Sequence, residues 1–265
     1  MLEKILYPSD LSPFSQKGLA WVAAKVTRKE SEIVIAHVVN PAAGYNTPHL
    51  VREAEIRLAV MEQSLLPYNL RHDTVALAGE EFETLAEYAQ NEECTLAILL
   101  AEPDDDLLAF VHKLAIPQLI LKTDGEELPE RDLFEHVVIA VGLFEERTER
   151  LLEAARAFLE GRNASVTLLH AVPLDDPGNA DLLVQAADAA LQTVSDALTP
   201  LVKEVRTLLV SGYPEEELPA ALQQLEPSLL ILGVSQHGEL WEVLVGSVAK
   251  SLIEETPCHI LIVPN

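Results

Sequence analysis

Basic residues are scarce in this chain: 18 lysines and arginines stand against 43 aspartates and glutamates, so the formal net charge is −25. A surface of that charge repels the phosphate backbone of nucleic acids, and it disfavours an anionic membrane for the same reason. Long hydrophobic runs are also lacking, because no apolar stretch approaches the ~20 residues needed to cross a bilayer. We therefore expect neither nucleic-acid binding nor membrane association.

Cysteine is nearly absent. Only Cys94 and Cys258 occur, and each lies in an apolar run typical of a buried strand. This pattern favours reduced, buried thiols over a disulfide framework, which makes the cytoplasm the expected location. The N-terminus enters a predicted strand at Lys4 without the long apolar region of a signal peptide, which agrees with that expectation.

The sequence signatures of several enzyme classes are missing as well. Neither half of the chain shows G-x-G-x-x-G after its first strand, the mark of a dinucleotide site. No Ser/His/Asp grouping, no Cys/His metal spacing and no paired general acid and base emerges. We therefore expect a protein without catalytic residues and without a metal site of its own.

What the chain does contain is an alternation of apolar strands and helical segments. With 49% hydrophobic residues it can bury a sizeable core. Strands that alternate with helices indicate parallel sheets covered on both faces. The sequence predicts an α/β fold of two tandem doubly wound domains, each a five-stranded parallel sheet with helices on both faces. The predicted strands are residues 4–8, 33–39, 75–78, 96–101 and 116–121, then 137–141, 166–172, 207–210, 229–232 and 259–263.

An internal repeat supports this division. Chance rarely keeps one spacing between matching residues over such distances, so a constant offset is a strong repeat signal. The pairs that lie 133 positions apart are His37 and His170, Gly79 and Gly212, and Leu100 and Gly233. We expect domains at residues 1–123 and 134–265, joined by an acidic linker from Thr123 to about Phe134.

One stretch near the C-terminus has the pattern of an anion site. The apolar strand 229–232 ends at Gly233, where a sharp exit suits a residue without Cβ. After a loop, Gly246 and Ser247 open a helix, with Ser247 near the N-cap. Backbone N–H groups at a helix start attract anions, and the helix dipole adds to that attraction.

The spacing of this stretch, Gly-x2-Gln-x9-Gly-Ser, resembles the nucleotide loop of the universal stress protein family, Gly-x2-Gly-x9-Gly-Ser/Thr. The second glycine of that pattern is Gln236 here. Further signals are the strand 5–8 that runs into Ser9 and Asp10, the helix led by Ser12, and the final run 257–264. Nearly the whole chain therefore resembles a tandem member of this family, a stress-response protein with two family domains.

The resemblance implies roles for residues of the first half. In the family, an acidic residue after the first strand contacts the nucleoside, and the end of the second strand packs on adenine. Asp10 and Val39 match these positions, although Asp10 also fits a simple capping role. The glycine loop has no counterpart, because Pro117 and Pro257 lie 140 positions apart, so seven residues are missing. We expect a vestigial site here.

The segment 102–115 takes the place of that loop. Three adjacent carboxylates at residues 104–106 would repel a triphosphate unless a metal intervened. A short helix follows, and its apolar residues recur at helical spacing. We expect this segment to fill the place of the first half's nucleotide, with four side chains pointing inward: Leu107, Phe110, Val111 and Leu114.

The second half keeps the loop but lacks the acid, because Gly142 occupies the position of Asp10. The resemblance makes the loop residues the nucleotide-binding candidates, although Ser247 also fits a cap without a ligand. These residues are Gly233, Ser235, Gln236, Gly246, Ser247 and Val248. Two interpretations stay open. One is weak binding of ATP with Mg²⁺ in the C-terminal half, and the other is an interaction or scaffold protein without any nucleotide.

The fifth strand of each half, at residues 118–121 and 259–263, is apolar. An exposed apolar edge strand invites pairing, and family domains commonly pair through this strand. We expect the two halves to form an internal pseudo-dimer through these strands, and the whole chain to form a homodimer.

Overall fold

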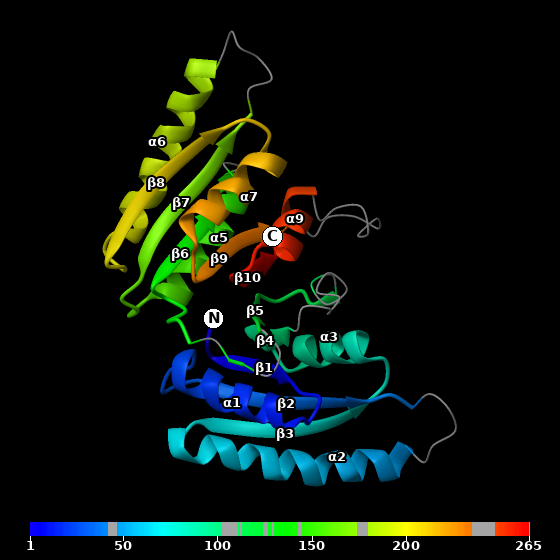
Figure 1. The fold of residues 1–265 in the computed structure, drawn as a ribbon. Coiled ribbons are helices and arrows are strands. Elements are labelled where there is room, and N and C mark those ends of the chain that lie inside the picture. Colours follow the sequence, from blue (N-terminus) through cyan, green and yellow to red (C-terminus); the bar gives the residue numbers. More distant parts are fainter. Residues whose placement is uncertain are drawn as a thin grey trace. The chain divides into compact units, whose positions relative to one another are not determined.

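The structure is a computed structural model of the 265-residue chain, and it describes residues 1–41, 47–101, 111, 113–123, 127–128, 130–142, 145–173, 180–234 and 247–264. The chain divides into two compact units, Met1–Leu128 and Pro129–Asn265 (Figure 1). This division falls within the stretch from Thr123 to Phe134 that the sequence suggests as the linker. Each unit has its own core and is described by itself.

The first unit alternates strands and helices along the chain. Its strands are β1 (Lys4–Pro8), β2 (Glu32–Val39), β3 (Arg71–Ala78), β4 (Leu96–Ala101) and β5 (Gln118–Lys122). Its helices are α1 (Pro13–Lys25), α2 (Thr47–Met61), the 3-10 helix η1 (Glu62–Tyr68) and α3 (Glu81–Asn91). Neighbouring strands are parallel, in the order β3-β2-β1-β4-β5.

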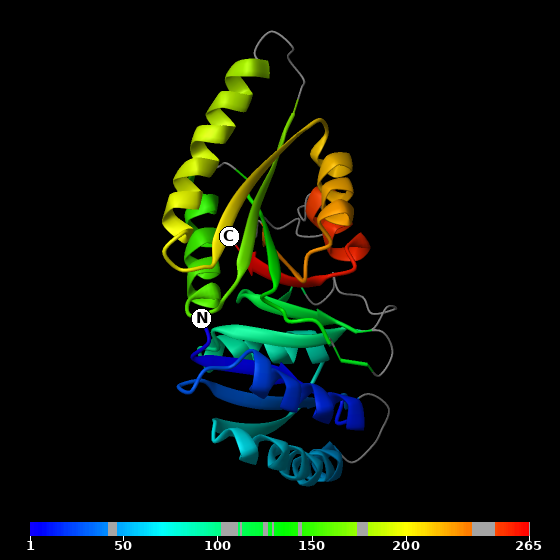
Figure 2. The same cartoon turned by 60° about the vertical axis from the view of Figure 1, so that its left-hand side comes forward.

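The second unit repeats this plan. Its strands are β6 (His136–Ala140), β7 (Ser165–Val172), β8 (Glu204–Ser211), β9 (Leu229–Val234) and β10 (His259–Pro264). Its helices are α5 (Glu145–Leu159), α6 (Ala180–Leu198), α7 (Pro214–Leu225) and α9 (Ser247–Glu255). The strands are parallel in the order β10-β9-β6-β7-β8. Figure 2 shows α5 and α6 on one face of this sheet and α7 and α9 on the other.

The predicted fold class is confirmed, because each unit is a doubly wound parallel sheet with helices. The repeat is also visible in the strand bounds: β2 and β7, and likewise β3 and β8, begin and end 133 positions apart. Strands β5 and β10 end the strand orders of their units. The expected pairing of these two strands with each other stays a prediction. Within the part of the chain that the structure describes, no helix is both long enough and apolar enough to cross a membrane.

Several details differ from the sequence-based expectation. Strands β3 and β8 begin at Arg71 and Glu204, earlier than the predicted residues 75 and 207. Strand β9 does not end at Gly233 but continues to Val234, because β10 extends far enough to pair with both residues. Gly233 is therefore an ordinary strand residue opposite Val263. The connection to the fifth strand is also shorter in the first unit than the prolines suggest.

The register of the paired strands gives the length of this connection more directly than the positions of Pro117 and Pro257 do. Gln118 pairs with Ala97, which lies 21 residues earlier, whereas Ile260 pairs with Leu230, which lies 30 residues earlier. The connection in the first unit is therefore nine residues shorter, not seven. The proline count is wrong because Pro117 directly precedes β5, whereas Pro257 stands two residues before β10.

The first helix begins where local chemistry predicts. The hydroxyl of Ser12 accepts a hydrogen bond from the Ser15 N–H at 3.0 Å, and Pro13 occupies the first helical position. The central strand β1 is buried on both faces, and its Tyr7 is wholly inaccessible to solvent. The Tyr7 hydroxyl donates to the Ser15 carbonyl at 2.8 Å, and burial raises the pKa of this phenol. Helix α1 is thus tied to the strand that it covers.

Gly18 allows α1 to lie close to the sheet. A Cβ at this position would lie 2.3 Å from Leu100 Cδ1 and 2.7 Å from the Tyr7 hydroxyl oxygen. These distances are shorter than real Cβ contacts, so any larger residue must push the helix or its neighbours away. The glycine therefore serves packing, although glycine in a helix interior is otherwise unfavourable.

We expect Gly18→Ala to lower the free energy of unfolding by about 1–2 kcal/mol, because overpacking costs ~1–3 kcal/mol and the better helix propensity of alanine offsets up to ~1 kcal/mol. Urea unfolding of the full chain measures this change. In the background of Leu100→Ala, which removes the closest atoms, the same substitution should cost less. An equal cost in both backgrounds would show that the contact with Leu100 is not the cause.

Candidate functional site

The topology of each sheet marks one crevice. In a doubly wound sheet, ligands bind outside the carboxyl ends of the strands, where the chain turns to opposite sides. In the first unit this switch point lies between β1 and β4, and in the second between β6 and β9. These are the strands that carry the sequence-predicted site residues. Asp10 follows β1 by two residues, Gly142 follows β6 by two, and Gly233 lies near the end of β9.

In the first unit, the predicted acid is engaged with its own loop. The carboxylate oxygen Oδ1 of the exposed Asp10 accepts a hydrogen bond from the Ser12 N–H at 2.9 Å. Between them, Leu11 has a φ of 64°, the left-handed region that non-glycine residues rarely adopt. The carboxylate therefore stabilises a strained turn before α1, in agreement with the capping role considered for Asp10. Val39, the other predicted residue, is buried at the end of β2.

Ser9 was not a candidate from sequence, yet it organises the same loop. Its buried hydroxyl lies 2.9 Å from the Ser15 hydroxyl and accepts the Leu11 N–H at 3.0 Å. It also lies 3.2 Å from the sulfur of Met61. These contacts join three segments of chain, so no local sequence pattern could have revealed them.

Part of the segment that replaces the glycine loop is buried. Val111 and Leu114 are almost wholly inaccessible, and the amide nitrogen of buried Gln118 donates to their carbonyls at 3.3 and 3.0 Å. The inward orientation expected for these two residues agrees with this burial. Leu107 and Phe110, which were expected beside them, lie outside the described residues, as does the acidic run 104–106.

In the second unit, the loop after β6 is held by a different contact. Gly142 is exposed, and its carbonyl accepts a hydrogen bond from the Thr148 hydroxyl at 2.6 Å. Thr148 lies 133 positions after Ser15 and occupies the corresponding place at the start of its helix, but the Ser15 hydroxyl contacts Ser9 instead. The glycine leaves the mouth of the crevice free of any side chain at the position matching Asp10.

A histidine stands beside the crevice in both units. The Nδ1–H of His37 donates to the Ser9 carbonyl, and that of His170 to the Val141 carbonyl, each at 2.7 Å. Burial lowers the pKa of His170, although the hydrogen bond to the Val141 carbonyl acts in the opposite direction. Both rings thus brace the end of the second strand against the loop after the first. Both half-buried histidines therefore have structural hydrogen-bond partners.

The structure describes only part of the predicted nucleotide loop. Gly233 and Val234 lie next to the end of β6, because Leu232 pairs with Ala140. Helix α9 begins at Ser247, its second residue Val248 is half-buried, and its first turn carries no acidic residue. Ser235, Gln236 and Gly246 lie outside the described residues. The crevice therefore combines a bare strand end with a helix start that does not repel an anion.

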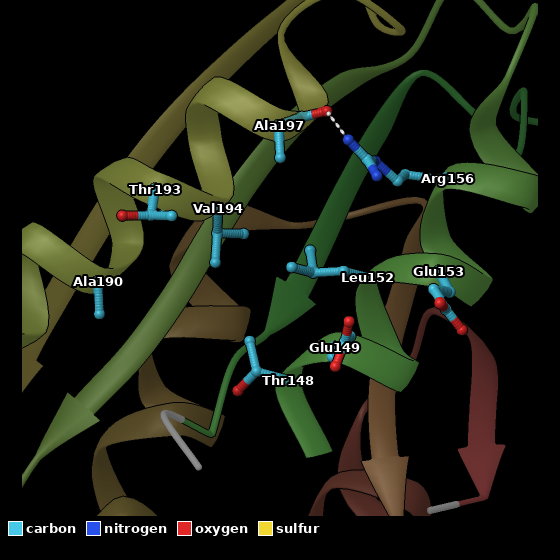
Figure 3. Close-up of a pocket in the computed structure, with 9 residues that line it drawn as sticks. All are labelled: Thr148, Glu149, Leu152, Glu153, Arg156, Ala190, Thr193, Val194 and Ala197. Carbon is cyan, nitrogen blue, oxygen red and sulfur yellow. Dashed lines mark hydrogen bonds between the residues drawn. The ribbon is translucent and has the colours of Figure 1, made fainter. Parts of the chain in front are cut away.

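No metal site competes with this crevice in the described ranges. A group of three or more His, Cys, Asp or Glu side chains placed to hold an ion is not found there. The two cysteines are free and buried, as the sequence predicts. An open groove of the second unit lies elsewhere, between α5 and α6 (Figure 3).

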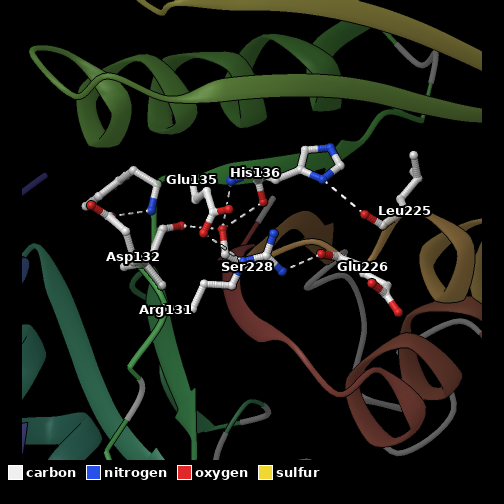
Figure 4. A network of polar contacts seen from close by, with 9 residues as sticks. Arg131, Asp132, Glu135, His136, Leu225, Glu226 and Ser228 are labelled. Carbon is white, nitrogen blue, oxygen red and sulfur yellow. Dashed lines mark hydrogen bonds and ion pairs between the residues drawn. The ribbon is translucent and has the colours of Figure 1, made fainter.

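A polar network occupies the opposite edge of the same sheet, where β6 and β9 begin (Figure 4). The Arg131 guanidinium donates to the Glu226 carbonyl at 2.6 Å and to the Glu135 carboxylate at 2.9 Å. The Ser228 hydroxyl donates to the His136 carbonyl at 2.9 Å. These contacts tie the start of β6 to the end of α7.

The imidazole of His136 belongs to this network and is fully engaged. Its Nδ1–H donates to the Leu225 carbonyl at 3.1 Å, and its Nε2 lies 3.0 Å from the Thr167 hydroxyl. Burial lowers the pKa of His136, and the nearby guanidinium groups of Arg131 and Arg206 act in the same direction. Perturbed pKa values often mark functional sites. Here both ring nitrogens already have protein partners, so the network is structural.

We expect His136 to make the second unit less stable as the pH is lowered. Its folded-state pKa lies below 6.5, so the unfolded chain binds the proton more readily. The contribution is complete above the unfolded pKa and is lost as the pH falls through the folded one. Urea unfolding at several pH values should show that the free energy of unfolding depends less steeply on pH in His136→Gln than in the wild type. His170, whose pKa is also lowered, contributes to the dependence that remains. An unchanged slope in that variant would contradict this assignment.

Comparison with known proteins agrees with these observations. A family model described as "Universal stress protein family" matches the chain twice, at residues 1–131 and 133–264. No protein with a curated description matches it in sequence. The crystal structure of a universal stress protein from Archaeoglobus fulgidus DSM 4304 is 19% identical with a TM-score of 0.73, covering 99% of this chain and 96% of that one.

Two further structures share the fold over the full length. A putative universal stress protein from Pseudomonas aeruginosa UCBPP-PA14 is 17% identical with a TM-score of 0.72, covering 99% of this chain and 93% of the other. The cytoplasmic domain of a prokaryotic cation chloride cotransporter is 13% identical with a TM-score of 0.61, covering 99% and 95%. The two family matches, one in each half, carry the conclusion: the chain belongs to the universal stress protein family and consists of two family domains in tandem.

Proposed function

We propose that this stress-response protein is a non-catalytic, cytoplasmic binding module that holds an adenine nucleotide weakly, with Mg²⁺, in the crevice of its second unit. The observation that carries this proposal is the switch point between β6 and β9. There, the neighbouring strands β6 and β9 end side by side, and the exposed Gly142 follows β6. Helix α9 is the next described element after β9. The equivalent place in the first unit has a shorter connection and a buried segment.

The chemistry of this crevice suits a phosphate group. The first N–H groups of a helix have no partners within the helix, and the dipole favours an anion beside them. The first turn of α9, from Ser247, has no carboxylate to oppose this attraction. In our proposal, the backbone N–H groups of Ser235, Gly246, Ser247 and Val248 hold the phosphates, with Gly233 and Gln236 shaping the loop.

The nucleoside end of the crevice lacks its usual hydrogen-bond partner. Gly142 occupies the position of Asp10 and has no carboxylate, and its carbonyl already accepts the Thr148 hydroxyl. A missing hydrogen bond to a charged group costs about 1.5–3 kcal/mol, which corresponds to roughly 10–100-fold in affinity. With a net charge of −25, the chain also repels a bare triphosphate. We therefore propose weak binding that Mg²⁺ strengthens.

We expect Gly142→Asp to tighten the binding of ATP in the presence of Mg²⁺ by roughly 10-fold or more, because a carboxylate returns to the nucleoside position. Ser247→Ala combined with Gly246→Val should abolish binding, because it removes the hydroxyl and blocks the loop. Isothermal titration calorimetry on the full chain measures both effects. Native mass spectrometry of the purified protein would show whether a nucleotide is already bound.

Asp10→Asn in the first unit is the matched control, and it should leave the heat of binding unchanged. Crystals soaked with ATP should show no triphosphate beside Asp10. If the wild-type protein gives no heat at millimolar ATP and Gly142→Asp does not restore binding, the nucleotide proposal is wrong.

The alternative is an interaction or scaffold protein without a nucleotide. The specific observation in its favour is that the Asp10 carboxylate already accepts the Ser12 N–H through Oδ1, and that Gly142 has no side chain to offer a nucleoside. The cotransporter domain described above shows that this two-unit fold also occurs as part of a transporter. Loss of the calorimetric signal in all variants would favour this alternative.

A further inference from the structure

The groove between α5 and α6 of the second unit has a volume of about 530 Å³ (Figure 3). Its α5 side includes the half-buried Leu152 and the exposed Glu149 and Glu153. Its α6 side includes Ala190 and Val194, one helical turn apart. The groove thus has an apolar floor and a charged rim on one side.

The equivalent groove of the first unit, between α1 and α2, is closed by larger side chains. Its volume is only about 190 Å³, and its lining includes Arg57 and Met61. These residues lie 133 positions before Ala190 and Val194, so the two grooves correspond. The Arg57 guanidinium also donates to the Leu11 carbonyl at 2.9 Å, which ties it across the gap. On α6, the second unit therefore has the smaller Ala190 and Val194 where α2 of the first unit has Arg57 and Met61.

The apolar surface continues along α6 beyond the groove. At helical spacing, Leu183 and Ala186 precede Ala190 on the same face, and Ala197 follows it. Leu182 and Leu183 are 64% and 44% exposed, which is high for leucine. The stripe from Leu183 to Ala197 spans about 21 Å at 1.5 Å per residue. Such a length suits an elongated occupant, and the alanines allow another helix to approach closely.

The charge of the rim restricts that occupant further. Among the residues that the structure describes, neither Glu149 nor Glu153 takes part in an ion pair. The nearby Arg156 is instead engaged with the carbonyl of Ala197 at 3.1 Å. The lining therefore carries two carboxylates and one guanidinium, and that guanidinium donates to a backbone carbonyl. The excess of negative charge favours lysine or arginine in the occupant.

We propose that the groove between α5 and α6 is a docking site for a basic amphipathic helix of a partner protein. The apolar stripe of that helix lies between Leu152 and the alanines of α6, and its flanking lysines or arginines face Glu149 and Glu153. Amphipathic helices bind grooves in this way through apolar anchors at positions i, i+3 or i+4, and i+7. None of the residues proposed to hold the nucleotide lines this groove, although its Thr148 also donates to the Gly142 carbonyl.

The test uses a fluorescein-labelled peptide of about four helical turns, with leucine at the anchor spacing and lysine elsewhere. Fluorescence anisotropy with the full chain should give saturable binding. A peptide of the same composition in scrambled order should bind at least about 10-fold more weakly, because it keeps the charge but loses the stripe. Equal binding of the two peptides, or no binding of the patterned one, would overturn the proposal.

Two pairs of variants locate the binding surface. Ala190→Phe, which fills the groove, and Glu149→Gln with Glu153→Gln, which removes the rim charges, should each weaken binding of the patterned peptide about 10-fold. The matched control for Ala190→Phe is Ala189→Phe, at the preceding, exposed position of α6. The control for the rim charges is Glu53→Gln with Glu55→Gln on α2, and both controls should keep wild-type affinity. Circular dichroism confirms that each variant is folded.

Groove variants that bind like the wild type would overturn the proposal. So would a dimer of the chain that dissociates on Ala190→Phe while the patterned peptide fails to bind, because the occupant would then be a second copy of the chain.

Discussion

The structure depends on covering both faces of a parallel sheet. Inner strands such as β1 and β9 have helices on either side, so almost every one of their side chains is apolar and buried. The covering helices must lie close to these strands. Gly18 and Tyr7 show what this requires: a helix position without Cβ, and a buried phenol that finds a backbone partner in the helix above it. Each unit meets this packing requirement on both faces of its sheet.

Burial of the strands leaves only the sheet edges for polar chemistry, and the two edges of the second unit differ. At the amino-terminal edge, the side chains of Arg131, His136 and Ser228 each donate a hydrogen bond to a backbone carbonyl. At the carboxyl-terminal edge, β6 and β9 end side by side at the switch point, and the exposed Gly142 follows β6 by two residues. A closed edge stabilises the unit, whereas an open edge can receive a ligand.

The sequence predicts those features that depend on local or periodic chemistry. The alternation of strands and helices, the Ser12 cap and the offset of 133 positions gave the fold class and the repeat, because each is carried by neighbouring residues or a constant spacing. The end of β9 at Val234 could not be predicted, because it depends on the length of β10 across the sheet. The contacts of Ser9 depend likewise on where α1 and α2 bring Ser15 and Met61.

The positions of the candidate site can be predicted from sequence, but their contacts cannot. The resemblance predicts that Asp10 and Gly142 occupy corresponding positions of the two candidate sites, and each of them lies at the switch point of its own unit. Sequence could not show that the Asp10 carboxylate is engaged with its own turn, or that Thr148 holds the Gly142 carbonyl. Those bonds are set by how each loop folds back onto the following helix, and the two units differ in this respect although their strands match.

The exposure of Gly142 has an evolutionary consequence. A side chain added at an exposed loop position displaces no core atoms, so mutation there has little effect on folding. Glycine and aspartate codons can differ by a single base. In a duplicated gene, one copy of the domain can therefore lose or regain a carboxylate at the crevice in one mutational step, while the other copy diverges independently. The chemistry of this one position can thus change without disturbing the fold that both copies share.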